Sequence, residues 1–166
     1  MVEFTGCDPA DPLIMIIHNA DSFKSIGGNK AVLARHFTEV LNQGHLDVID
    51  EIYTSDYVLD APVQSDGSSQ ARGLTHGREQ LKQRVTLFRT AFPDIQFTQD
   101  EVVGEDDTVV VRYTYRGTHQ GVFAGVQPSG HSIAIPGILV AHLTNGKIWQ
   151  AISAFDSAEL MKQLGN

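Results

Sequence analysis

The sequence predicts a single α+β domain in which a curved antiparallel sheet wraps around helices. Three observations support this fold class. Helical periodicity dominates the chain up to Pro93, the residues after Pro93 have the composition of β-strands, and Asn145-Gly146 is a strong hairpin signal. A curled sheet of this kind leaves a concave face, where a small-molecule pocket can form.

Amphipathic helices make up the first part of the predicted fold. The first is expected over 29–44, where apolar side chains recur at helical spacing and Gly44 can end the helix. A short helix is expected over 46–53. A third begins near residue 78 and stops at Pro93, which cannot continue a helix.

Extended and irregular segments account for the rest of the chain. A brief strand is expected over 57–61, whereas residues 63–75 have loop composition and no period. Four longer strands and a closing helix are predicted after Pro93, over 95–103, 109–118, 132–143, 147–155 and 157–164.

The composition argues against several classes of partner and site. The formal net charge of −8 disfavours binding to nucleic acid and to anionic membrane surfaces. The single cysteine, Cys7, can form neither an internal disulfide nor a multi-thiolate metal site, and it fits a reducing cytoplasm. The seven histidines show no metal-ligand spacing, so no metal is expected. Acidic residues near the N-terminus disfavour a signal peptide. We therefore expect a cytoplasmic protein with an N-terminal extension (1–28) and one domain (29–166).

Several motifs resemble one known family. Phe88-Arg-Thr-Ala-Phe-Pro-Asp94 resembles the "FRxAFPD" helix end of SnoaL-like polyketide cyclases, and Gly117-Thr-His-Gln-Gly121 with the residues that follow resembles their "GTHxGxFxG" loop. The resemblance covers about 29–165. It implies the nuclear transport factor 2-like superfold shared with ketosteroid isomerase, a cone-shaped α+β barrel of cystatin-like topology. It also implies acid/base chemistry without a cofactor.

The chain departs from this family at the acid/base position. The resemblance implies an aspartate on the last long strand, and Ser153 stands there. An alcohol cannot replace a carboxylate as proton acceptor unless a base lies beside it. Asp60 is the proposed replacement, because many relatives carry a polar pocket residue at this place, before Ala61-Pro62. Burial there would raise its pKa. The alternative is a solvated aspartate before a proline.

Strand alternation and the loop after residue 118 supply the other candidates. Tyr113 and Tyr115 fall on the side expected to be concave, where a tyrosine can donate to a ligand or simply pack. His119 either lines the mouth of the pocket or orients the loop, and Phe123 offers an apolar plug. The predicted catalytic residues are Asp60, Tyr113 and His119. The predicted ligand-binding residues are Tyr115, Phe123, Leu139, Trp149 and Ser153, with His142 on the opposite face.

Three functions stay open. The first is a cyclase or isomerase acting on a small hydrophobic carbonyl compound, the second a binding protein that kept the pocket and lost the chemistry, and the third a hydratase or hydroxylase-type enzyme. The expected ligand is a small hydrophobic molecule in each case. A homodimer through the convex face is also expected, because the apolar side chains left there form a large patch: Val110, Ile138, Val140 and Ile152.

Overall fold

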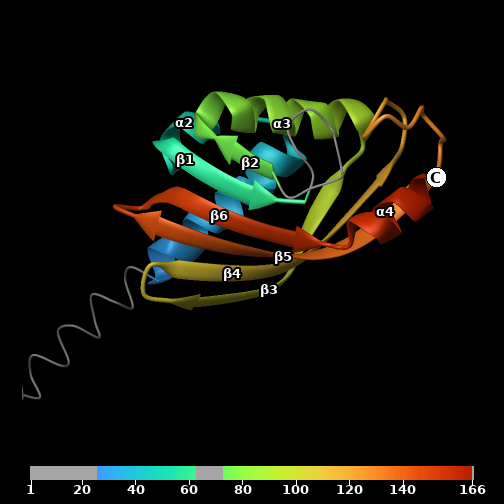
Figure 1. The fold of residues 1–166 in the computed structure, drawn as a ribbon. Helices are drawn as coiled ribbons and strands as arrows, with labels where there is room; N and C mark the ends of the chain where they lie inside the picture. The colour runs from blue at the N-terminus through green and yellow to red at the C-terminus, as the bar shows by residue number, and fades with distance from the viewer. Residues whose placement is uncertain (1–25, 63–72, 166) are drawn as a thin grey trace, which may run out of the picture.

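A computed structural model of the chain describes residues 26–62 and 73–165. In these residues the strands are β1 (Tyr53–Ala61), β2 (Gly73–His76), β3 (Gln96–Glu105), β4 (Thr108–Thr118), β5 (Ser132–Thr144) and β6 (Lys147–Phe155). They form one curved sheet in the order β2-β1-β6-β5-β4-β3 (Figure 1). The edges β2 and β3 do not pair with each other, so the sheet stays open. The predicted α+β class is confirmed.

The helices follow the predicted order with small changes in their bounds. Residues 26–35 are α-helical, and the same helix continues as a π-helix, η1 (His36–Asn42). The helix therefore already includes Gly27 and Gly28, where the sequence suggested that the extension ends. The other helices are α2 (Val48–Ile52), α3 (Gly77–Ala91) and α4 (Ser157–Leu164). Most of the predicted extension, Cys7 included, lies outside the described residues.

Strands β3 to β6 form the predicted antiparallel meander. Asn145 and Gly146 adopt φ values of 49° and 71° in the turn between β5 and β6, which confirms the hairpin. Strand β1 then joins β6 in parallel, and β2 pairs with β1. Residues 73–75 were predicted as loop and are strand instead. This strand has only four residues, too few for alternation to stand out in the sequence.

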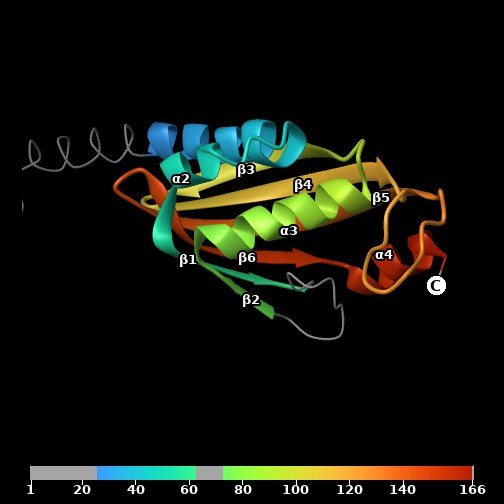
Figure 2. The ribbon, with the colours of Figure 1, turned by 90° about the horizontal axis from the view of Figure 1, so that it is seen from above.

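The first helix and α3 lie on the same face of the sheet (Figures 1 and 2). The first helix buries Leu33, Phe37 and Val40 against this face, and α3 buries Leu81 and Val85. These apolar side chains recur every three or four residues, which is the spacing that brings them to one side of a helix. Helix and sheet therefore share one hydrophobic core on the concave side.

A β-bulge in β6 overturns the predicted orientation of Trp149. His142 pairs with Gln150, whereas the next residue, Leu143, pairs with Ile148, so Trp149 is an extra residue in β6. One extra residue reverses the alternation along a strand. Ile148 is consequently buried, and Trp149 is 42% exposed and packs near the His142 ring, with ring centroids 6.0 Å apart. The prediction that Trp149 lines the pocket is wrong, and His142 faces away from it as expected.

Candidate functional site

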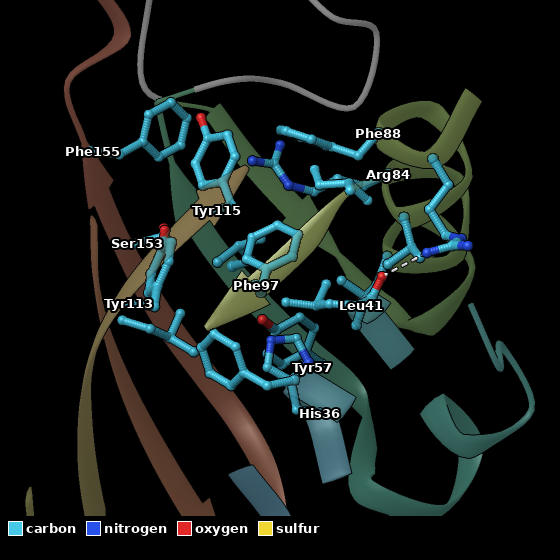
Figure 3. Close-up of a pocket in the computed structure, with 17 residues that line it drawn as sticks. His36, Leu41, Tyr57, Arg84, Phe88, Phe97, Tyr113, Tyr115, Ser153 and Phe155 are labelled. Atoms are coloured by element: carbon cyan, nitrogen blue, oxygen red, sulfur yellow. Dashed lines mark hydrogen bonds between the residues drawn. The ribbon is translucent and has the colours of Figure 1, made fainter. Parts of the chain in front are cut away.

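A cavity lies between the concave face of the sheet, η1 and α3 (Figure 3). Most of its 17 lining residues are aliphatic or aromatic. Its unfilled volume is about 80 Å³, which corresponds to roughly five to eight water-sized spheres. Pockets for drug-sized molecules usually exceed ~300 Å³. The cavity in this form therefore suits a small, compact ligand.

His36 lies at the point where the first helix changes from α-helical to π-helical. Such π-helical turns are rare and often accompany functional sites. The ring is buried in the cavity wall, and the Tyr53 hydroxyl lies 2.6 Å from Nδ1. Burial lowers the pKa of His36 to about 4, so the ring is neutral near pH 7. Because Tyr53 holds Nδ1, Nε2 is the nitrogen that can meet a ligand.

Tyr113 on β4 and Ser153 on β6 meet across the intervening strand β5. The Tyr113 hydroxyl lies 3.0 Å from Ser153 Oγ. Gly137 makes this approach possible, because a Cβ there would come within 2.6 Å of the Tyr113 ring. Burial raises the pKa of Tyr113, and the bond to Ser153 opposes that shift. Tyr113 is therefore a neutral hydroxyl that can donate a hydrogen bond and is a poor base.

Arg84 on α3 brings a positive charge to the cavity. It is only 7% exposed, and its guanidinium carbon lies 5.4 Å from the centre of the Phe88 ring, a cation–π distance. Burial lowers the pKa of Arg84, and the nearby Tyr57, Tyr113 and Tyr115 oppose that shift. An arginine pKa starts so high that the group stays charged at neutral pH.

Tyr115 lies beside Arg84 in the cavity wall (Figure 3). It is 1% exposed, and its hydroxyl has no hydrogen-bond partner among the described residues. Its ring contacts those of Phe97 and Phe155, with centroids 5.2 and 5.8 Å away. Burial raises its pKa well above the usual value, so this hydroxyl also keeps its proton. An unsatisfied buried hydroxyl of this kind can donate to a ligand.

The cavity wall brings together four of the residues singled out in the sequence: Tyr113, Tyr115, Leu139 and Ser153. Their functional roles stay predictions. Alternation placed them correctly because β4 is regular and the bulge of β6 lies before Ser153.

Asp60 is not among the residues that line the cavity, so its predicted place in the pocket is wrong. Its role as the base stays an untested prediction. On β1, Tyr57 and Leu59 line the cavity, and Ala61 is also buried. Successive side chains of a strand point to opposite faces, so Asp60 points to the convex side, in register with Ile152 of β6. The same alternation, applied to this strand in the sequence, would have placed Leu59 inside and Asp60 outside.

His119, directly after β4, is buried but does not line the cavity. The backbone N–H of Ser129 donates to its Nδ1 at 3.2 Å, and the ring packs near Phe92 at 5.5 Å between centroids. An accepting Nδ1 places the proton of a neutral ring on Nε2. His119 therefore orients the loop, which was the alternative role, and its predicted catalytic role stays untested.

Phe123 lies behind the wall rather than in it. Its ring is buried and contacts Phe88 and Phe92, with centroids 5.0 and 5.3 Å away. Phe88 is the side chain that lines the cavity. Phe123 thus supports the wall through Phe88 and does not itself line the cavity, and its predicted contact with a ligand stays untested.

The sequence analysis missed four polar lining residues: His36, Tyr57, Arg84 and Arg89. Arg84 had a usable signal, since it lies three residues after Leu81 and four before Phe88, within the apolar stripe of α3. His36 likewise lies inside the apolar stripe of the first helix. A polar residue in such a stripe faces the core or a cavity.

Within residues 26–62 and 73–165, no group of three His, Cys, Asp or Glu side chains is arranged to hold a metal ion. No helix in those residues has both the length and the apolar character needed to span a bilayer.

A family model of SnoaL-like polyketide cyclases matches residues 31–164. Among solved structures, a protein from Jannaschia sp. CCS1 provisionally assigned as a SnoaL-like polyketide cyclase superposes with a TM-score of 0.74. It is 22% identical over 96% of this chain and 97% of its own. IdmH from Streptomyces antibioticus, provisionally assigned as a polyketide cyclase, gives 0.69 and 26% over 83% of this chain and 99% of its own.

AclR from Streptomyces galilaeus, provisionally assigned as a hydroxylase, has a TM-score of 0.69 and 23% identity, and the match covers 84% of this chain and 82% of AclR. A protein from Burkholderia pseudomallei described as NTF2-like also shares the fold, with a TM-score of 0.68 and 18% identity over 84% of this chain and 98% of its own. No curated protein sequence matches the chain. The resemblance inferred from the motifs is confirmed, and so is the fold that it implied.

Proposed function

This chain belongs to the SnoaL-like polyketide cyclase family, and we propose that it acts on a small hydrophobic carbonyl compound by acid/base chemistry without a cofactor. His36 transfers the proton in this proposal. The observation that carries it is His36, which lines an otherwise largely apolar cavity and is held from behind by the Tyr53 hydroxyl. The small volume of the cavity favours a compact substrate.

Removal of a proton next to a carbonyl group requires a base. The described lining contains no aspartate or glutamate, and Asp60 points to the other face. The tyrosine hydroxyls of the wall keep their protons because burial raises their pKa values. A neutral imidazole with a pKa of about 4 has nearly the basicity of an ordinary carboxylate, for which the pKa is about 4. His36 can therefore take the place of the missing carboxylate.

The pairing with Tyr53 suits this role. When Nε2 accepts a proton from the substrate, Nδ1–H donates to the Tyr53 oxygen, 2.6 Å away. Negative charge then develops on the carbonyl oxygen of the substrate. A neutral hydroxyl on the His36 side of the wall, such as that of Tyr57, stabilises that charge in a site with little water. The proton returns from Nε2 to a different atom of the substrate, so no cofactor is consumed.

A non-catalytic binding protein is the second candidate. The specific observation that favours it is the Tyr113–Ser153 contact, which stands where relatives carry their acid/base aspartate. A hydroxyl pair can hold a ligand oxygen but cannot take up its proton. Binding without proton transfer is the result that this candidate predicts.

Hydrogen–deuterium exchange at carbon tests the proposal without knowledge of the natural substrate. The protein is incubated in D₂O with 1-phenylpropan-2-one, and loss of the α-proton signals is followed by NMR. We expect the wild type to accelerate exchange, and His36→Gln to lose about a hundredfold or more of that rate, the usual contribution of a general base.

Two variants serve as controls. Ser153→Ala should keep the exchange rate within about tenfold, roughly 1.4 kcal/mol of barrier, and Asp60→Asn should keep it because the side chain lies outside the cavity. If the ketone binds and the wild type does not accelerate exchange, the binding protein is the better description. If Asp60→Asn alone abolishes exchange, His36 is not the base.

A further inference from the structure

The cavity has a positive electrostatic character inside an acidic protein. The chain carries a net charge of −8, yet the described lining holds two arginines and no carboxylate. Arg89 uses its guanidinium on η1, where it donates to the carbonyl oxygens of Leu41 and Asn42 at 3.0 and 2.7 Å. Arg84 lies deeper, beneath the Phe88 ring. A guanidinium carries five N–H donors, so Arg84 can donate to a ligand anion while it keeps its interactions within the protein. A low-dielectric interior strengthens the attraction between such a cation and an anion.

The second, independent observation is the Tyr115 hydroxyl. It is buried and has no hydrogen-bond partner among the described residues. Buried hydroxyls in folded proteins nearly always have a partner, and an exception needs an explanation. Figure 3 shows the Arg84 and Tyr115 side chains next to each other, and Tyr115 is one of the groups that oppose the lowering of the Arg84 pKa, so both can donate to one group of a ligand.

The rings around this place suit the apolar part of a ligand. Phe88, Phe97 and Phe155 surround Tyr115, with ring centroids 5.2 to 6.4 Å away. Figure 3 shows Arg84, Tyr115, Phe88 and Phe155 together on one side of the cavity, while His36 and Tyr57 lie on the other. The Arg84–Tyr115 pair and His36 thus lie at opposite ends of the cavity.

We propose that Arg84 and Tyr115 form a carboxylate subsite, so that the ligand is a small hydrophobic keto acid rather than a neutral ketone. This inference rests on the proposed function, since it names the substrate class of the same cavity. The guanidinium and the phenol both donate to the carboxylate, and the carbonyl end of the molecule reaches His36. The volume of about 80 Å³ limits the ligand to a compact one.

Binding of a matched pair of compounds tests the subsite. The probes are 3-phenylpropanoate and 4-phenylbutan-2-one, which have the same shape and differ in a carboxylate against a methyl ketone. Their affinities are measured by calorimetry or NMR titration at pH 7. We expect the wild type to bind the carboxylate at least about tenfold more tightly.

Two variants then separate charge from packing. Arg84→Met should remove most of this preference and leave the affinity for the ketone within about threefold, whereas Arg84→Lys should keep part of it. Tyr115→Phe should reduce the preference about threefold or more, because it removes one donor and keeps the ring. If Arg84→Met does not fold, Tyr115→Phe decides the matter alone.

Three outcomes overturn the proposal: equal binding of the two compounds by the wild type, an unchanged preference in both variants, or no binding of either compound at millimolar concentration. The His36→Gln variant keeps the two proposals distinguishable. It should lose carbon-proton exchange and keep the carboxylate preference. A protein that prefers the carboxylate but never accelerates exchange has the subsite without the proposed chemistry.

Discussion

The two faces of the sheet are built from the same strands and have different surroundings. On β5, Ile135 points to the concave side and is fully buried, whereas Ile138, three residues later, points outward and is 47% exposed. Alternation supplies apolar side chains to both faces, but only the concave face is covered by the first helix and α3. Whether an apolar side chain of the sheet is buried therefore depends mainly on whether helices pack over its face, and less on which residues that face carries.

The polar groups of the two faces differ as strongly. On the convex face Arg112 forms ion pairs with Asp100 and Glu101, at 3.3 and 3.5 Å, in contact with water. On the concave side the polar groups are neutral rings and hydroxyls, with Arg84 as the buried charge. Exposed ion pairs contribute little to stability and can vary freely. Burial of a polar group costs free energy unless the group is hydrogen-bonded. The polar groups of the concave side are therefore the ones in which we expect a function.

Two alanine substitutions, one on each face of β5, measure most directly how differently the two faces are buried. Ile135→Ala should cost about 3 to 4 kcal/mol of unfolding free energy, because it leaves a cavity in the core. Ile138→Ala on the same strand should cost less than about 1 kcal/mol. Urea denaturation of the two variants, at a protein concentration low enough for the chain to be monomeric, gives both values. Similar costs would mean that the convex face is covered as well as the concave one.

The pH dependence of the unfolding free energy tests whether burial on the concave side keeps His36 neutral. Its pKa is about 4 in the folded protein and about 6.5 in an unfolded chain. The unfolded state therefore binds more protons between these values, so stability falls as the pH drops from about 6.5 to about 4. The loss from this group is about 3 kcal/mol over that window.

Denaturation of the wild type and of His36→Asn at several pH values isolates this contribution, because carboxylates titrate in both proteins. The difference between their stabilities should shrink as the pH falls. Tyr53→Phe is the matched control: burial causes the shift, so this variant should keep the wild-type slope. A constant difference between wild type and His36→Asn from pH 7 to pH 4 would show that the ring is not held neutral by burial.

The order of the elements could be predicted from the sequence because it depends on local signals. Hydrophobic period, Pro93 and the Asn145-Gly146 turn act within a few residues, and each of them was interpreted correctly. Asp156 supplies another local signal, because its Oδ1 accepts from the Glu159 N–H at 2.9 Å and caps α4. The small edge strand β2 was not predicted, because it depends on pairing with β1, which is a long-range property and leaves no local signal.

The site was harder to predict because it depends on register. The bulge in β6 directs Trp149 to the convex face, and no local sequence pattern predicts a bulge. The family's acid/base position indicated Ser153, and its lack of a carboxylate indicated Asp60 as a replacement. The cavity instead takes His36 from η1 and Arg84 from α3. Which side chains of two helices meet across a curved sheet follows from packing, and a single sequence does not show it.

The prediction with the smallest expected free-energy change concerns the convex face of the sheet. In register across the sheet lie Leu74, Asp60, Ile152, Val140, Val110 and Val103. Leu74, Val103 and Ile152 are exposed, as is the neighbouring Ile138. We propose that a second copy of the chain packs on this face, because a monomer rarely leaves such a contiguous apolar area in water.

Sedimentation equilibrium should then show a homodimer at micromolar concentration. Ile138→Asp combined with Ile152→Asp should weaken association at least about a hundredfold, which corresponds to about 2.7 kcal/mol. Both side chains point away from the cavity, so the double variant should keep the ligand preferences of the wild type. Glu105→Ala, at the end of β3 beyond the apolar row, is the control and should leave association unchanged. A wild type that sediments as a monomer would mean that the apolar row of the convex face is tolerated in water, and the contrast between the two faces would then lie in their chemistry alone.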